Sequence, residues 1–221
     1  MARFLSLVAA VAVCVSFSGC SLIPGMGGGG GAYKPTECMN NQYAGDLADA
    51  KVGRSMTYAS EAGGSKTLMI TKCVGKDGGD TWIESWMEMP SMAYGFLFKV
   101  GSDKKITEAY AAAKDDKEWT KITVKEPPKM DAQKGPEPKI VKSSEKKDVK
   151  AGGFDCTKLD VTVNVGGKDY NSLTWYSKDV WKLAMPSEHG GMVAMEGSGS
   201  KMTLESKAED AKPTIELPAK K

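Results

Sequence analysis

Short runs in which apolar and polar residues alternate recur along most of this chain. The clearest run is CTKLDVTVNV, residues 156–165, in which every second residue from Leu159 to Val165 is apolar. A period of two is typical of a strand with one buried face. The pattern therefore predicts a mainly β fold built on an antiparallel sheet with hairpin turns. Similar runs, rich in aromatic and β-branched residues, cover residues 55–60, 66–74, 80–89, 94–100, 171–181, 191–197 and 201–207.

Two segments depart from this alternation. Residues 41–51 place Tyr43 and Leu47 four positions apart, with Gly53 just beyond, which predicts one short amphipathic helix. Residues 104–124 contain EAYAAAK, whose residues favour a helix. Because the flanks of this second segment alternate as strands do, we interpret it as a hairpin with KDDK at the turn, and a helix is the alternative.

Residues 125–139 interrupt the sheet pattern with four prolines, many lysines and few apolar side chains. Such a segment cannot bury enough apolar surface to stay ordered. We expect a flexible, exposed excursion there, with a strand resuming at about Lys139. Residues 38–218 as a whole are expected to form a single β-rich domain. The predicted fold class is thus mainly β (α+β), with one short N-terminal helix.

The first residues have the features of a secretion signal. An early arginine is followed by an apolar run from Phe4 to Phe17, which predicts a signal peptide over residues 1–19. The run is shorter than the roughly 20 apolar residues that span a bilayer. The glycines Gly27–Gly31 follow it and predict a flexible tether over residues 20–37.

The stretch FSGC, residues 17–20, resembles the lipobox of bacterial lipoproteins. In that family a cysteine after small residues is acylated and becomes the first residue of the mature protein. The resemblance implies lipidation of Cys20, with diacylglycerol and palmitate as the anchor, although Phe17 stands where the family usually has leucine. Ser21, rather than aspartate, implies sorting to the outer membrane. The alternative is ordinary cleavage, which would release a soluble protein.

Charge and motifs argue against several classes of function. Lys and Arg number 30 against 28 Asp and Glu, and this near balance does not favour nucleic acid as a partner. The sequence lacks GxxxxGK[ST], HExxH, GxSxG and CxxC, and its single histidine, His189, lies in a predicted turn. We therefore expect no enzyme, no catalytic residues, no metal and no cofactor.

Sulfur-containing residues give two candidate roles. Cys73 and Cys156 both lie in predicted strands and are the favoured disulfide pair, while Cys38 keeps the pairing open. Methionine thioethers favour Cu(I), but in a strand they suit an apolar core equally well, and we favour the core. The methionines concerned are Met87, Met89 and Met92.

The run DTWIESWMEM, residues 80–89, carries two candidate ligand-facing residues, Trp82 and Trp86. We expect them on one face of a strand, with Glu84 and Glu88 on the other. If they are exposed, they form an aromatic platform for a partner or ligand. If they are covered, they form a second buried layer, which is the interpretation that we favour.

The last third of the chain resembles a known kind of protein. The order FDCTKLDVTV, GKDY, LTWYSKDV, GGMVAMEG and SKMTLES is similar to the closing strands of uncharacterised bacterial envelope lipoproteins. Their sheets are half-barrels like that of the lipoprotein-carrier fold. The resemblance implies a curved sheet that can wrap a helix or enclose an apolar ligand. It transfers no residue of known chemical role except Cys20.

Together these features predict a lipid-anchored, non-catalytic cell-envelope protein that faces the periplasm and acts as a binding or structural module. Its expected partners are the membrane, through the lipid on Cys20, and an unidentified envelope protein or apolar ligand. The alternative function is a carrier of an acyl chain or, with less support, of Cu(I).

Overall fold

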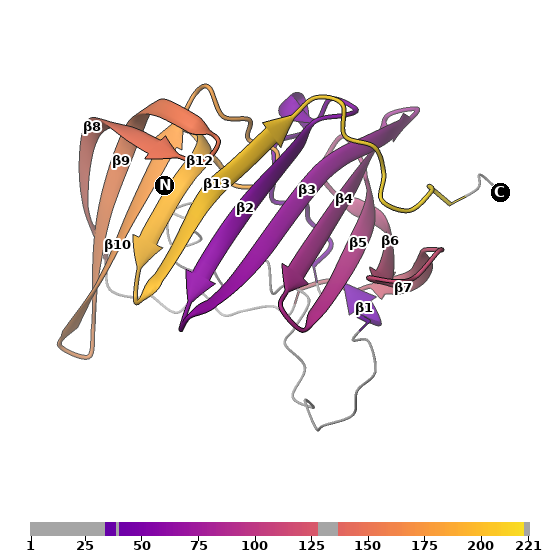
Figure 1. The fold of residues 1–221 in the computed structure, drawn as a ribbon, viewed down its shortest axis with the longest axis horizontal. Helices are drawn as coiled ribbons and strands as arrows, with labels where there is room; N and C mark the ends of the chain where they lie inside the picture. Colours follow the sequence, from indigo (N-terminus) through magenta and orange to yellow (C-terminus); the bar gives the residue numbers. More distant parts are fainter. Residues whose placement is uncertain (1–33, 39, 128–136, 219–221) are drawn as a thin grey trace.

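A sheet of antiparallel hairpins dominates the computed structural model, which describes residues 34–38, 40–127 and 137–218 (Figure 1). Thirteen strands of these described residues belong to the one sheet. None of the described residues forms a helix that is long and apolar enough to cross a membrane. The strands are β1 (Glu37–Cys38), β2 (Ser55–Ala62), β3 (Ser65–Asp77), β4 (Asp80–Met89), β5 (Met92–Val100), β6 (Ile106–Ala113), β7 (Thr120–Val124), β8 (Lys139–Val149), β9 (Gly152–Val165), β10 (Lys168–Ser177), β11 (Pro186–Ser187), β12 (Gly190–Gly197) and β13 (Ser200–Ala208).

The strand order in the sheet is β1-β7-β6-β5-β4-β3-β2-β13-β12-β10-β9-β8, with β11 paired to β12. Strands β1 and β7 are parallel, and the other paired strands are antiparallel. The prediction of a mainly β fold with a mostly antiparallel sheet is therefore confirmed. Two blocks of consecutive hairpins, β2–β7 and β8–β12, are joined where β13 pairs with β2. That pairing runs from Ser200 opposite Ala62 to Ala208 opposite Ser55.

The segment with the ambiguous pattern is a hairpin, as interpreted from its flanks. Strand β6 pairs with β7, and KDDK lies in the connection between them. Ala109 and Ala111 are 0% exposed, and they lie opposite Phe98 and Phe96 of β5. Small side chains fit beside these large rings, so packing in the sheet overrides the helix preference of alanine.

The predicted helix over residues 41–51 was wrong. This segment contains one 3-10 turn, η2 (Leu47–Asp49), and is otherwise irregular. Its backbone donates hydrogen bonds to the β5–β6 turn through Tyr43 and to the loop before β11 through Asp46, both at 2.8 Å. Gly45 lies so close to that loop that a side chain would clash with it. Hydrogen bonds to distant loops thus replace those of a helix, and we call residues 41–51 the strap.

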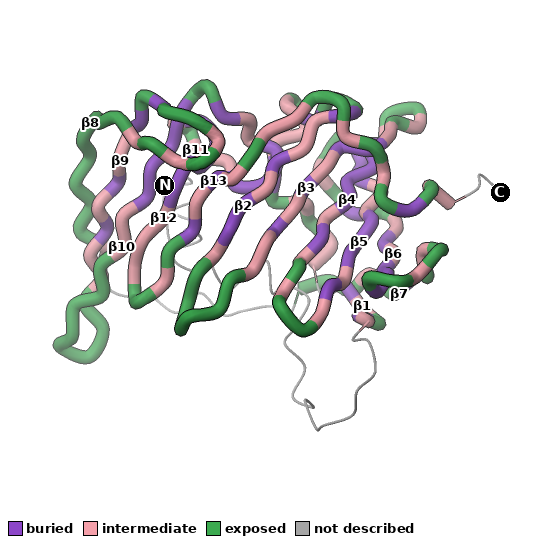
Figure 2. The backbone as a smooth tube through the Cα atoms, viewed as in Figure 1, coloured by how far each residue is buried: buried purple, intermediate pink, exposed green. Residues whose placement is uncertain are grey.

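Buried residues recur along most strands of the sheet (Figure 2), and their side chains form clusters on both of its faces. The largest cluster includes Ile83 and packs against Tyr43 and Leu47 of the strap. Two smaller clusters surround Trp82 and Trp86, which point to the opposite side of β4 from Ile83. Side chains of the largest cluster that are at most 1% exposed include Met56, Tyr58, Cys73, Ile83, Val100, Leu183, Val193 and Leu204.

Strand β8 lies at one end of the sheet, and its side chains are exposed from Lys139 to Lys146. Its last residues fold over neighbouring strands, since Lys147 Nζ lies 3.6 Å from the centre of the Trp175 ring and 3.0 Å from Glu196 Oε1. The predicted return to a strand at about Lys139 agrees with the start of β8. The centre of the predicted excursion, residues 128–136, lies outside the described residues.

The hydroxyl of Tyr58 gives a test of the core packing. It donates to the Met192 carbonyl at 2.8 Å, and Tyr58 is 1% exposed. Tyr58→Phe leaves this carbonyl without the bond, and we expect the free energy of unfolding in urea to fall by about 1–3 kcal/mol. Tyr170→Phe is the matched control, because Tyr170 is 44% exposed. Equal losses in the two variants would contradict the buried hydrogen bond.

Candidate functional site

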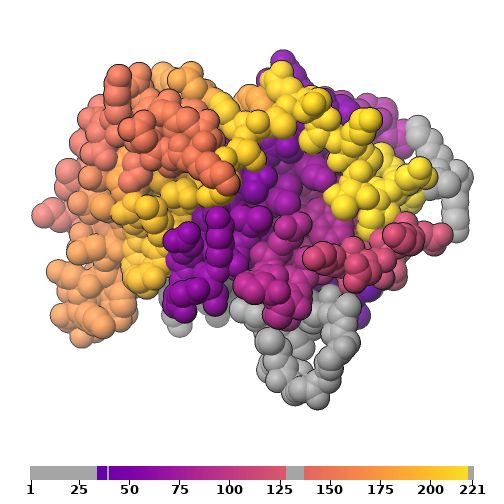
Figure 3. Space-filling model, in the orientation of Figure 1, coloured from indigo at the N-terminus to yellow at the C-terminus, as the bar shows by residue number. Residues whose placement is uncertain are grey.

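The two candidate ligand-facing tryptophans are buried beneath the chain's own C-terminal residues. Trp82 is 7% exposed and Trp86 is 5% exposed. Ile215 packs into the cluster of Trp86, and Leu217 packs against the cluster of Trp82. Figure 3 shows these C-terminal residues in yellow across strands of the N-terminal half of the chain. The favoured interpretation of a second buried layer agrees with this geometry, although the cover is a C-terminal segment rather than a helix.

Further aromatic rings complete this surface. The Trp86 ring lies 5.8 Å from that of Trp119, and the Trp82 ring lies 6.1 Å from that of Tyr110, measured between ring centres. Gly95 lies beneath Trp86, where a Cβ would come within 2.6 Å of the indole. The close approach of the Trp86 indole to the sheet therefore requires glycine at position 95. We call the surface formed by Trp82, Trp86, Tyr110 and Trp119 the aromatic groove.

A buried carboxylate lies between the two tryptophans. Glu84 is 0% exposed and shares their face, because residues two apart in a strand point the same way. The expectation that it lies on the opposite face was wrong. Its Oε1 accepts from Trp86 Nε1 at 2.8 Å and from Lys72 Nζ at 2.9 Å. The sequence alone places Glu84 on the face of the tryptophans, because positions 82, 84 and 86 are two apart.

The C-terminal segment completes the coordination of Glu84. The main-chain N–H of Thr214 lies 2.9 Å from Oε2 and 3.2 Å from Oε1, and the Thr214 hydroxyl also donates to Oε1. A buried charge is tolerated only when it is paired and hydrogen-bonded. Lys72 supplies the opposite charge, and Thr214 supplies two of the donors. The carboxylate of Glu84 therefore accepts both an N–H and an O–H group from one residue of the segment that covers it.

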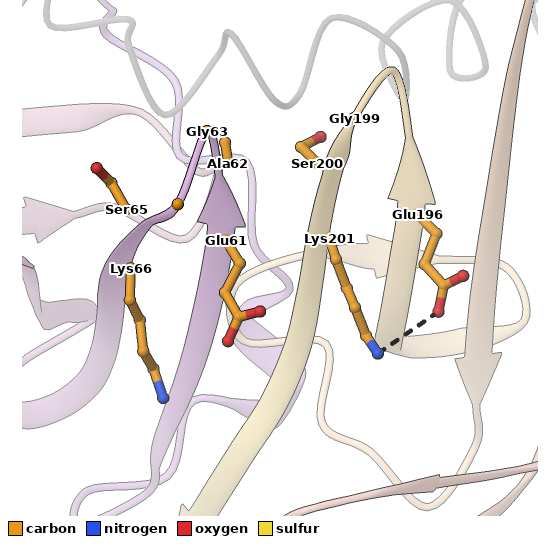
Figure 4. Close-up of a pocket in the computed structure, with 10 residues that line it drawn as sticks. Glu61, Ala62, Gly63, Ser65, Lys66, Glu196, Gly199, Ser200 and Lys201 are labelled. Carbon is orange, nitrogen blue, oxygen red and sulfur yellow. Dashed lines mark ion pairs between the residues drawn. The ribbon is translucent and has the colours of Figure 1, made fainter.

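A concave region lies between the tips of the β2–β3 and β12–β13 hairpins (Figure 4). It encloses about 500 Å³, and Glu196, Lys201, Glu61 and Lys66 form a row of opposed charges across four strands. Lys201 Nζ lies 3.9 Å from Glu196 Oε1. Opposite charges on adjacent strands stabilise one register. Because the row has no net charge, we assign it to the pairing of the sheet rather than to a ligand.

Another groove, of about 620 Å³, is lined by Cys156, Tyr176 and His189, among others. Burial raises the pKa of Cys156 to about 11, and burial lowers the pKa of His189. The Cys156 thiol contacts the Phe154 carbonyl at 3.5 Å, and His189 Nε2 lies 3.4 Å from Glu188 Oε1, so the described contacts of these two side chains do not pair them as nucleophile and base. Across residues 34–38, 40–127 and 137–218 there is no group of three or more His, Cys, Asp or Glu that could hold a metal ion.

The two cysteines of the predicted disulfide are buried thiols in this structure. Cys73 lies on β3 and Cys156 on β9, and strands β2, β13, β12 and β10 separate them in the sheet. No bond joins them here, and Cys156 Sγ instead lies 3.5 Å from the Phe154 carbonyl. The oxidation state in the envelope stays a prediction. Cys20, the predicted lipidation site, lies outside the described residues.

The methionines that were considered for Cu(I) lie at the β4–β5 hairpin. Met87 packs against the main core, and its sulfur accepts a hydrogen bond from the Tyr94 hydroxyl at 3.1 Å. Met89 and Met92 are paired across the turn. These contacts fit the core interpretation of Met87, and binding of Cu(I) stays an untested alternative.

Comparison with known proteins gives distant similarity only. No family model matches the chain, and no curated protein matches it. Among solved structures, a candidate exported protein with a YmcC-like fold from Bacteroides fragilis is 8% identical, with 76% of this chain and 99% of that chain covered and a TM-score of 0.33. A candidate lipoprotein from Parabacteroides distasonis is 11% identical, with coverage of 76% and 99% and a TM-score of 0.32. PNGF-II is 12% identical over 70% of this chain and 27% of its own, with a TM-score of 0.31.

The buried carboxylate gives a test of the aromatic groove. Glu84→Gln removes the charge that Lys72 and Thr214 contact, and we expect the free energy of unfolding to fall by about 1.5–3 kcal/mol. Glu88→Gln, on the same strand and face but exposed, should change it by less than about 0.5 kcal/mol. Chemical denaturation of both variants measures the difference. If the free energy of unfolding of Glu84→Gln equals that of the wild type, the carboxylate does not hold the C-terminal segment.

The thiols give a test that depends on pH. Burial raises the pKa of Cys73 and raises that of Cys156 to about 11, so folding favours the protonated thiols. This contribution to stability is complete below the unfolded pKa of about 8.5 and is lost as the pH rises towards 11. At pH 8 we expect iodoacetamide to modify both thiols slowly in the native protein and quickly in urea. If the unfolded protein reacts only after reduction, the thiols are in disulfides, and peptide mapping then distinguishes the predicted Cys73–Cys156 pair from a pair with Cys38.

Proposed function

We propose that this chain is a lipid-anchored, non-catalytic protein of the bacterial cell envelope that acts as a binding or structural module. The stretch FSGC, after an apolar signal and before a run of glycines, carries this proposal. Two or more acyl chains on Cys20 would hold the protein stably on a membrane. Ser21 favours the outer membrane, with the domain facing the periplasm.

The sheet supports a role in binding rather than in chemistry. We propose that it is a half-barrel, because the end of β8 folds back over β12 and β13 and the strap joins the β5–β6 turn to the loop before β11. The chemistry that the described groups favour is recognition through aromatic rings and a buried carboxylate. An unidentified envelope protein is therefore the proposed partner, with the membrane as the anchor.

A carrier of acyl chains is the weaker candidate. The space beside the strap is filled by side chains such as Met56, Tyr58, Leu183 and Leu204, each at most 1% exposed. An acyl chain would have to displace these residues, whereas apolar ligand pockets are usually formed before the ligand binds. Packing in the main core thus favours a protein partner.

Lipidation gives the test of this proposal. In cells fed a labelled fatty acid, we expect the wild-type protein to carry the label and Cys20→Ala to lose it and to accumulate as an unprocessed precursor. Cys14→Ala, which changes a cysteine inside the predicted signal peptide, is the matched control and should keep the label. A wild-type mature protein that begins at Ser21 or later and carries no acyl mass would refute the anchor.

A further inference from the structure

We infer that the aromatic groove is a peptide-binding site and that residues 212–217 are its internal occupant. The partner that fits it is a segment that, like residues 212–217, lies outside any strand and has Ser or Thr, an apolar residue at the next position and another apolar residue two positions later. When the partner binds, its segment takes the place of residues 212–217. The inference rests on the proposed binding role and names the chemistry of the partner.

The polar part of the site recognises one residue of the bound segment by accepting hydrogen bonds from two donors of that residue. Glu84 is held from the sheet side by Trp86 Nε1 at 2.8 Å and by Lys72 Nζ at 2.9 Å. Its remaining acceptor positions face the C-terminal segment, where Thr214 offers both its main-chain N–H and its hydroxyl. Hydrogen bonds to a buried, fixed carboxylate are strong and directional. Ser and Thr provide a main-chain N–H and a short side-chain O–H from one position of the chain, which matches the two bonds that Thr214 makes.

The apolar part of the site sets the spacing of the recognised segment. Ile215 is 6% exposed and packs with Trp86, Ala112 and Trp119. Leu217 lies against the cluster of Trp82 and passes close to Gly75, where a Cβ would come within 2.9 Å of the Leu217 Cδ1 atom. Thr214 and Ile215 lie in a bend rather than in a strand, so the Thr214 hydroxyl and the two apolar anchors all contact the same face of the sheet. The pattern that fits is Thr or Ser, apolar, any residue, apolar.

The segment is attached in a way that allows exchange. The described hydrogen bonds that hold residues 212–217 use side chains, namely those of Lys72 and Glu84 in the sheet and of Trp119 in the β6–β7 connection. No described residue of this segment belongs to a strand, and Lys212, Thr214 and Glu216 are exposed. The segment can therefore leave while the strand pairing of the sheet persists. Attachment of this kind is typical of the less stable parts of a protein.

Separation of the segment from the folded protein tests this inference. A protease site inserted between Asp210 and Ala211 of the full chain lets the protein fold first and be cut afterwards. A fluorescent peptide KPTIELP, the sequence of residues 212–218, is then added, and binding is measured by anisotropy. We expect one peptide to bind each cut protein, and the uncut protein to bind it at least roughly tenfold more weakly, because its own segment competes.

Peptide and protein variants test the recognised groups. A peptide with Val in place of Thr keeps the shape but loses the hydroxyl, and we expect roughly tenfold weaker binding. Glu84→Gln in the cut protein should weaken binding of the unchanged peptide to a similar degree. Glu88→Gln, an exposed position on the same strand, should leave it unchanged.

Three outcomes would overturn the inference. The cut protein could unfold, which would make the segment an essential part of the core. It could stay folded but never exchange its segment for the peptide. It could bind the Thr and Val peptides equally, which would remove the role of Glu84. Because none of these measurements depends on acyl labelling of Cys20, their failure leaves the proposed membrane anchor untouched.

Discussion

The pairing of β13 with β2 is the constraint on which the rest of the structure depends. These strands are far apart in sequence, yet they join the block β2–β7 to the block β8–β12 along one continuous ladder. The same pairing sets Lys201 opposite Glu61, which extends the row of charges at the hairpin tips. It also places the residues that follow β13 beside Gly53, whose carbonyl accepts a hydrogen bond from the Ala211 N–H at 2.9 Å. From there the last residues reach the aromatic groove.

The strands were predictable because their cause is local. Where one face of a strand is buried, apolar residues recur every second position, and the runs at residues 80–89 and 201–207 match β4 and β13 closely. The hairpin at residues 104–124 followed from the same alternation, although its alanines favoured a helix. In each of these cases the strand predicted from the alternation is paired with a neighbouring strand of the sheet.

The strap and the C-terminal cover could not be predicted, because their partners are distant. Residues 41–51 have a helical spacing, but their backbone is bonded to loops near residues 104 and 182. The cover of Trp82 and Trp86 by Ile215 and Leu217 depends on where β13 ends in the sheet. The position of Glu84, by contrast, could be predicted, since the face that it shares with the tryptophans follows from the period of two. Its partner Thr214 required the three-dimensional structure.

The chain order of these elements has a consequence for how the protein reaches its native state. Strand β2 is made early and stays an unpaired sheet edge until β13, near the other end of the chain, becomes available. Closing so long a loop costs entropy before any contact compensates for it, and non-local pairing of this kind slows folding. During that interval an exposed strand edge and two uncovered tryptophans favour aggregation. The pairing of β13 and the packing of Ile215 and Leu217, which follow one another in the chain, therefore remove both hazards together.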